Sequence, residues 1–295
     1  GNIGLMLELQ TIAESLNSKS KGRAWVFVTS QEDMERVVGL QSKEQSNDFS
    51  KIRDRFATRV NLTSYDVAEV IRRRLLAKKR DAEPELESIY DAEKANFKAF
   101  FVFDDGKTYK NYETSAQFVD TYPFIDYQFT LFHQAMIGLS DHNAFEGRHA
   151  AVGERSMLAA TQQVAASIAS KGIGALASFD RFYDGLEADI KASARGQIEQ
   201  AKRLLTDELA IRTLKCLFLV KFVDGFSGTV RNLSILLFDA FNRSIPELKD
   251  RIKTALDALE SGNYVRRNGE IYEYLTNDEQ VMESEIRGVN VDAGD

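Results

Sequence analysis

The sequence is poor in cysteine, in proline and in long hydrophobic runs, and each shortage excludes a class of protein. The one cysteine, Cys216, cannot build a disulfide framework and fits a reducing compartment, so a cytoplasmic location is expected. No apolar run approaches the ~20 residues of a membrane-spanning helix, and no membrane contact is expected. Three prolines in 295 residues leave room for long helices.

The first ten residues, "GNIGLMLELQ", lack an initiator methionine and the basic flank of a signal peptide. They lead directly into a helical pattern, and we expect a portion of a longer chain. With 43% hydrophobic and 28% charged residues, the composition is that of an ordinary globular protein of one large or two smaller domains.

The net charge is −7, but the charges are unevenly distributed. Residues 51–80 hold ten lysines and arginines against Asp54, Asp66 and Glu69. Such a basic stretch on an acidic protein indicates a specific contact with an anion or a partner. A solvated helix face explains the same pattern equally well.

Hydrophobic spacing predicts a mostly α-helical chain with a partial α/β portion at its start. Residues 5–16 fit a helix, residues 23–29 a fully buried strand and residues 57–62 a second short strand. An amphipathic helix over 63–79 then begins at Thr63 or Ser64, either of which is a good N-cap. This portion has too few strands to close a sheet alone.

The rest of the chain is predicted to be helical with breaks. Pro123 should end one helix before another starts, and further helices are expected over 153–169 and 186–206. Three helices follow, over 208–223, 229–241 and 246–262, and then a hairpin over 264–275 with Asn268-Gly269 as its turn. Three helices followed by a hairpin is the layout of a winged-helix domain.

The phosphate-binding loop of P-loop ATPases is missing. Gly106, Lys107 and Thr108 supply its last residues, but Phe101 stands where the first glycine belongs. Asp104 and Asp105 would in addition repel a phosphate. No metal site is predicted either, because His142 and His149 with their acidic neighbours match no known ligand spacing.

Arginines are the strongest candidates for chemistry. Arg53 and Arg55 lie two residues apart on a short predicted helix, from which a guanidinium could reach a phosphate across a subunit boundary. Arg155 lies in the first turn of the helix predicted over 153–169, where the helix dipole favours anions. A surface salt bridge is the alternative for each of them.

Eight segments spread along the chain match the pattern of one family. They are "LMLELQTIAE", "GRAWVFVTSQED", "NDFSKIRDRFATRVNLTS", "DVAEVIRRRLL", "YPFIDYQFTLF", "GERSML", "LKCLFLVKFV" and "YVRRNGEIYEYLTNDEQ". In sequence and in order they resemble the large P-loop ATPase of BREX phage-defence systems, the BrxC/PglY family. The match extends from residue 5 to about residue 287.

The resemblance implies an AAA+-like fold in four parts. Residues 1–80 would be the C-terminal part of the ATPase core, 81–206 a helical lid, 207–276 a winged-helix domain and 277–295 an acidic C-terminal segment. The family places the phosphate loop and the magnesium-binding acid earlier in the chain. ATP and Mg²⁺ are therefore expected in the complete ATPase, and this portion alone is expected to be inactive.

The resemblance also assigns roles to the site residues. Ser30, with Thr29 and Gln31 beside it, falls at the first sensor of the γ-phosphate. Arg55 falls at the arginine finger, which acts on ATP held by a neighbouring subunit, with Arg53 as second choice. Arg155 falls at the second sensor. Copies of the same chain and other BREX components are the implied partners.

Two further hypotheses use the C-terminal part. The winged helix could bind DNA through Lys249, Arg251, Arg266 and Arg267, although six acids lie among its basic residues in 246–276. Alternatively, the lid and the acidic segment serve as a scaffold for another protein.

Overall fold

The computed structural model describes residues 64–104, 109, 111–146 and 154–288, together with scattered positions before residue 61. Contacts divide the chain into two compact units, with the boundary between Thr63 and Ser64. The elements described below all belong to the second unit.

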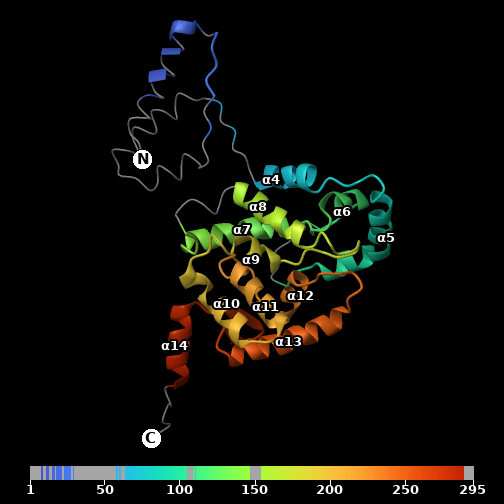
Figure 1. Ribbon diagram of the computed structural model, residues 1–295, viewed down its shortest axis with the longest axis vertical. Coiled ribbons are helices and arrows are strands. Elements are labelled where there is room, and N and C mark those ends of the chain that lie inside the picture. The colour runs from blue at the N-terminus through green and yellow to red at the C-terminus, as the bar shows by residue number, and fades with distance from the viewer. Residues whose placement is uncertain are drawn as a thin grey trace. The chain divides into compact units, whose positions relative to one another are not determined.

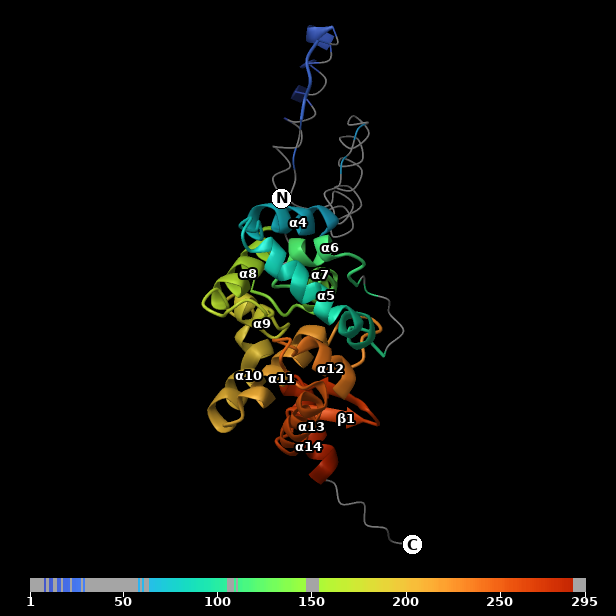
Figure 2. The same cartoon turned by 90° about the vertical axis from the view of Figure 1, so that its right-hand side faces the viewer.

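In chain order these elements are α4 (Ser64–Val70), the π-helix η1 (Ile71–Leu75), α5 (Glu83–Phe100), α6 (Ser115–Thr121), α7 (Tyr127–Asp141), α8 (Glu154–Ser167), α9 (Arg181–Leu186), α10 (Ala192–Leu204), α11 (Glu208–Val220), α12 (Val230–Leu236), α13 (Ile245–Ser261), β1 (Val265–Asn268), β2 (Ile271–Tyr274) and α14 (Asn277–Gly288). The expectation of a mostly helical chain is confirmed. Figures 1 and 2 both show α4–α8 gathered at one end of this unit and α10–α14 at the other, with α9 between them. Because α4 packs on α7 and α8, residues 64–80 associate with the helices that follow them, although the predicted ATPase core extends to residue 80.

The buried strand predicted over 23–29 is wrong. The described residues of this stretch, 23–27 and 29, form no strand, and Trp25 and Phe27 are 85% and 87% exposed. Thr58 and Val60 of the second predicted strand are likewise in no strand. An apolar run becomes a buried strand only where other strands pair with it, and no described residue does so here.

Most predicted helices of the second unit are present. α6 ends at Thr121, before Pro123, and α7 begins at Tyr127, as expected. The helix predicted over 186–206 is shorter and begins only at Ala192. Ile190 is buried and forms a β-bridge with Phe145, so the chain is extended where the helical pattern was expected to continue.

Polar side chains define the starts of several helices. The Thr114 hydroxyl accepts a hydrogen bond from the Gln117 backbone amide, and the Gln117 side-chain oxygen accepts one from the Thr114 backbone amide. The Asp207 side chain caps α11 by accepting from Leu209 N, and the Thr229 side chain caps α12 by accepting from Asn232 N. Ser244 caps α13, which has Pro246 in its first turn as predicted. Each such cap stabilises its helix by ~1 kcal/mol.

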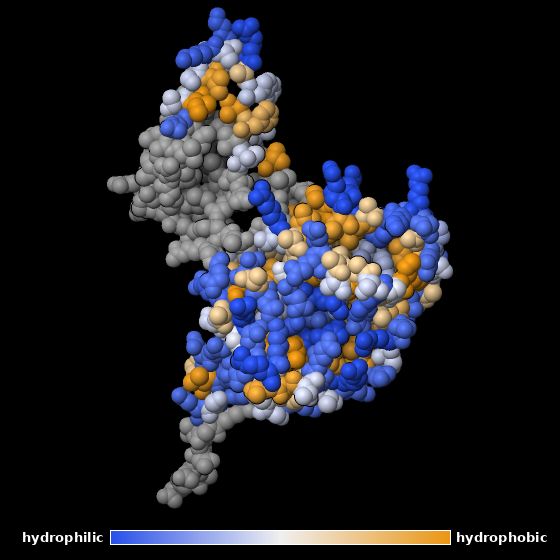
Figure 3. Space-filling model, in the orientation of Figure 1, coloured by the Kyte–Doolittle hydropathy of each residue, from blue (hydrophilic) through white to orange (hydrophobic). Residues whose placement is uncertain are grey.

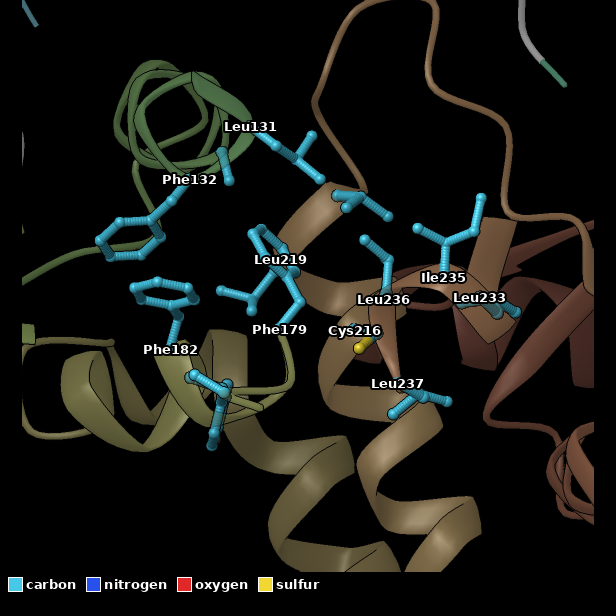
Figure 4. Close-up of a cluster of buried hydrophobic side chains, with 14 of the residues drawn as sticks. Leu131, Phe132, Phe179, Phe182, Cys216, Leu219, Leu233, Ile235, Leu236 and Leu237 are labelled. Atoms are coloured by element: carbon cyan, nitrogen blue, oxygen red, sulfur yellow. The ribbon is translucent and has the colours of Figure 1, made fainter. Parts of the chain in front are cut away.

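An apolar core joins the two ends of the unit. In Figure 4, Phe132 of α7 stacks on Phe182 of α9, with ring centroids 4.1 Å apart. Cys216 of α11 and Leu236 of α12 are fully buried in the same core. Burial raises the pKa of the Cys216 thiol, which packs in this core as an apolar group.

The segment between α8 and α9 crosses this core in an extended conformation. Its backbone amides are paired on both sides: Ala177 N donates to Pro123 O at 2.9 Å, and Phe179 N donates to Leu236 O at 2.8 Å. Residues 176–180 are all buried. The segment thereby holds Asp180 inside the protein, at the start of α9.

The predicted hairpin is confirmed, with its turn shifted by one residue. β1 and β2 are antiparallel, and Asn268 pairs with Ile271, so Gly269 and Glu270 form the turn. Gly269 has φ of +62°, which glycine adopts without strain. The hairpin contacts α11 and α13, and Tyr272 N donates to Gly228 O, ahead of α12, at 3.0 Å.

Candidate functional site

Among the site residues predicted from the sequence for nucleotide binding, Arg155 is the one whose surroundings the structure describes in most detail. It lies in the first turn of α8 and is exposed, and no hydrogen bond or ion pair holds its side chain within the described ranges. The helix beneath it is firmly positioned, because Met157 and Ala160 are buried and a Cβ added at Gly185 of α9 would lie 3.0 Å from Ala160 Cα. A free guanidinium on a fixed helix N-terminus is suited to an anionic ligand.

Of the other predicted nucleotide-site residues, the structure describes only Thr29. Thr29 is exposed and in no regular structure. Ser30, Gln31, Arg53 and Arg55 lie outside the described residues. Gly106, Lys107 and Thr108, the incomplete phosphate loop, lie outside them as well.

A pocket that sequence reasoning missed lies between the end of η1 and the C-terminal end of α8. Its volume is about 300 Å³. Leu75 and Leu76 line it from one side, Ala165 and Ile168 from the other, and Tyr122 is part of its wall. Two lysines, Lys78 and Lys171, also line the pocket. The basic stretch in the sequence pointed toward Lys78, but only the fold brings Lys171 beside it.

Lys78 is half-buried in this pocket. Its ammonium donates to Leu76 O at 2.5 Å. Burial lowers the pKa of Lys78 to about 8, although the charges of Asp120 and Glu83 oppose the shift. Neither carboxylate forms an ion pair with Lys78 in the described part of the chain. The phenol of Tyr122 accepts a hydrogen bond from Gly174 N at 2.9 Å, and burial raises its pKa.

The cations around the pocket differ in their partners. Arg72 Nη1 lies 3.6 Å from Asp126 Oδ1, and Arg73 forms an i,i+4 pair with Glu69 at 2.7 Å. Within the part of the chain that the structure describes, no carboxylate pairs with the remaining basic residues, which are Arg74, Lys79, Arg80 and Lys171.

The face proposed for DNA is neutralised by carboxylates. On the hairpin, Arg266 Nη2 lies 2.5 Å from Glu273 Oε2, and Arg267 Nη2 lies 3.8 Å from Glu270 Oε1. Carboxylates of α14 also face Arg266, whose pKa is raised chiefly by the hydrogen bond to Glu273. Lys249 and Arg251 lie on α13 among acidic residues, which are Glu247, Asp250, Asp257 and Glu260. This arrangement does not favour a phosphate backbone.

A buried polar cluster links α9, α11 and the end of α12. Arg212 of α11 binds Asp180 with two hydrogen bonds, from Nε to Oδ2 at 3.0 Å and from Nη2 to Oδ1 at 3.3 Å. Its Nη1 donates to Asp239 Oδ2 at 3.1 Å, and its Nη2 donates to Ser178 Oγ at 3.0 Å. Asp239 Oδ1 forms an ion pair with Arg243 but accepts no hydrogen bond. Because Arg212 is hydrogen-bonded to both aspartates and all three side chains are little exposed, we interpret this cluster as a structural clamp that holds these elements together.

Among the described residues, no group of three or more His, Cys, Asp or Glu side chains converges on a point that could hold a metal ion. His142 stacks on Phe222 instead, with ring centroids 3.7 Å apart, and His149 lies outside the described residues. None of the described helices has the length and apolar character needed to cross a bilayer.

No protein-family model matches the chain, and no solved structure matches it. Any assignment of function therefore rests on the residues themselves and on their placement in this structure.

Proposed function

We propose that this chain is part of an AAA+-like ATPase of the BREX phage-defence type, and that it senses ATP and acts on ATP bound by a neighbouring subunit. The observation that carries the proposal is Arg155, whose exposed guanidinium lies on the first turn of α8 and pairs with none of the residues that the structure describes. A second-sensor arginine has to be free in this manner, since its partner is the γ-phosphate of the nucleotide.

The remaining roles follow from the resemblance. Ser30, flanked by Thr29 and Gln31, is the first sensor, which positions the attacking water or reads the γ-phosphate. Arg55, or failing that Arg53, is the finger that stabilises the charge developing on the transferred phosphoryl group. In the family that the chain resembles, a phosphate loop and a Mg²⁺-binding acid complete the site, so we propose that ATP and Mg²⁺ bind in the complete subunit.

The contacts of α11, α12 and α13 with one another, and of α11 and α13 with the hairpin, support the proposal of a winged-helix domain. We assign it to protein contacts, with copies of the same chain or with other BREX components. The ion pairs of Arg266 and Arg267 are the reason for preferring a protein partner over DNA. A DNA-binding role of this face remains the alternative.

ATP hydrolysis by the complete subunit tests the proposal. Arg155→Ala is expected to lower turnover by about 10²–10³-fold, which is typical for the loss of one electrostatic group at a reacting centre. Arg155→Lys should recover only part of the rate, because an ammonium cannot make bidentate contacts. The matched control is Arg203→Ala, which removes an exposed arginine at the end of α10 and should leave turnover unchanged. Equal rates for Arg155→Ala and the control would refute the assignment.

A further inference from the structure

The pocket between η1 and α8 and the cations around it, which pair with no described carboxylate, form one surface. The proposed ATPase function assigns no role to this surface. We call it the basic groove and define it by Lys78 and Lys171 in the pocket and by Arg74, Lys79 and Arg80 beside it. Six of the ten residues 71–80 are basic and none is acidic. Figure 3 shows strongly hydrophilic side chains projecting from the surface beside α4, the helix that leads into this segment.

Described residues provide few ion pairs for the charges of the basic groove. The nearby carboxylates of Glu69 and Asp126 are occupied by Arg73 and Arg72. Glu83 and Asp120 act on Lys78 only at a distance. Positive charge concentrated in this way on a chain of net charge −7 implies an anionic partner, since cations without carboxylates around them gain most from an external anion.

The shape of the basic groove narrows the chemistry of that partner. Its floor is apolar, with Leu75 and Ile168 on opposite sides and the half-buried ring of Tyr122 in the wall. Lys78 and Lys171 line the same pocket as these apolar side chains. A ligand must therefore offer an apolar body and a negative charge next to each other. A nucleotide unit does so, because a ring with an apolar face is attached to a phosphate in every repeat. Acidic side chains carry the charge without the ring.

We propose that the basic groove binds single-stranded nucleic acid, with phosphates on the lysines and arginines and a base against the apolar floor. In duplexes the bases are stacked inside and cannot enter the pocket, so a single strand is the form that fits. Guanidinium groups such as those of Arg74 and Arg80 are in addition well matched to phosphate oxygens. Although burial lowers the pKa of Lys78 to about 8, the side chain is still mostly protonated at pH 7 and can contribute its charge.

The test measures the binding of a fluorescent oligothymidine to the 295-residue chain. Fluorescence anisotropy gives the binding constant at each of several salt concentrations. We expect binding that weakens with salt. The double variant Lys78→Gln/Lys171→Gln should bind at least tenfold more weakly, and the slope of log K against log[salt] should become shallower by about 1.4 for two lost phosphate contacts. The matched control is Lys94→Gln/Lys98→Gln, which removes the same charge from exposed positions of α5 and should bind as the wild type does.

A second pair, Arg74→Gln/Arg80→Gln, changes exposed residues only and should also weaken binding, which guards against misfolding of the lysine variant. The proposal is overturned if the chain does not bind oligothymidine, or if both groove variants bind as well as the wild type. Loss of binding in a further variant, Lys249→Gln/Lys253→Gln on α13, with both groove variants unchanged, would place the nucleic acid on the helix–hairpin face and overturn the proposal. Equal competition by polyglutamate would identify an acidic protein as the partner and would likewise overturn the proposal. Loss of ATPase activity in Arg155→Ala bears on none of these outcomes.

Discussion

Replacement of Arg212 by methionine should destabilise the protein more than any exposed charge removal. Methionine keeps much of the length of the apolar stem but removes the guanidinium. Asp180, with its side chain 5% exposed, then loses two hydrogen bonds and its counter-ion, while Asp239 retains Arg243. Breaking a buried ion pair by removing one partner costs about 3–5 kcal/mol. For a domain of this size, that corresponds to a fall in Tm of roughly 6–20 °C.

Urea denaturation followed by circular dichroism measures this loss. The control is Arg266→Met, which breaks the half-exposed pair with Glu273 and should cost less than about 1 kcal/mol. The double variant Arg212→Met/Asp180→Asn should recover at least about 1 kcal/mol relative to Arg212→Met, because it removes the buried unpaired charge. If Arg212→Met costs no more than the exposed control, the interpretation of this cluster as a structural clamp is wrong.

The remaining predictions concern packing and pH. Gly138→Ala should lower the free energy of unfolding by about 1–3 kcal/mol, because the new Cβ would lie 2.5 Å from Phe222 O, whereas Gly172→Ala meets no atom within 4 Å and should cost less than about 1 kcal/mol. Thermal unfolding of both variants measures these losses of stability. Equal losses for Gly138→Ala and Gly172→Ala would contradict the close contact between Gly138 and Phe222. Oligothymidine binding should weaken between pH 7 and pH 9 as Lys78 loses its proton, and Lys78→Gln should flatten this dependence. Glu83, Asp120 and Lys171 are the other charged groups facing it, and a wild-type profile as flat as that of Lys78→Gln would exclude Lys78 from the contact.

The helical part of the fold could be predicted from local signals. Pro123 separates two helices, Pro246 and Ser244 mark the start of α13, and Gly269 marks the hairpin turn. Each of these residues acts through its own backbone or through neighbours a few residues away, so the sequence alone contains the information.

The errors arise where a residue depends on distant partners. Trp25 and Phe27 form an apolar run, but a strand also needs neighbouring strands, and a short run cannot show whether they exist. Ile190 continues a helical pattern and yet is extended, because it pairs with Phe145 of another loop. Lys171, in a stretch without a recognisable motif, joins the basic groove only through the packing of α8.

The central claim is that residues from two neighbouring subunits together form the site that hydrolyses ATP. Mixing two inactive variants tests this claim most directly. Arg155→Ala keeps the finger, and Arg55→Ala keeps the second sensor. Each variant alone should hydrolyse ATP more slowly than the wild type. For the finger variant, Arg55→Ala, we expect turnover to fall by about 10³-fold or more. In mixed assemblies, some sites combine an intact Arg155 with an intact Arg55 from the neighbour, and turnover should recover to a substantial fraction of the wild-type rate. A mixture no faster than the mean of the two variants would contradict the account.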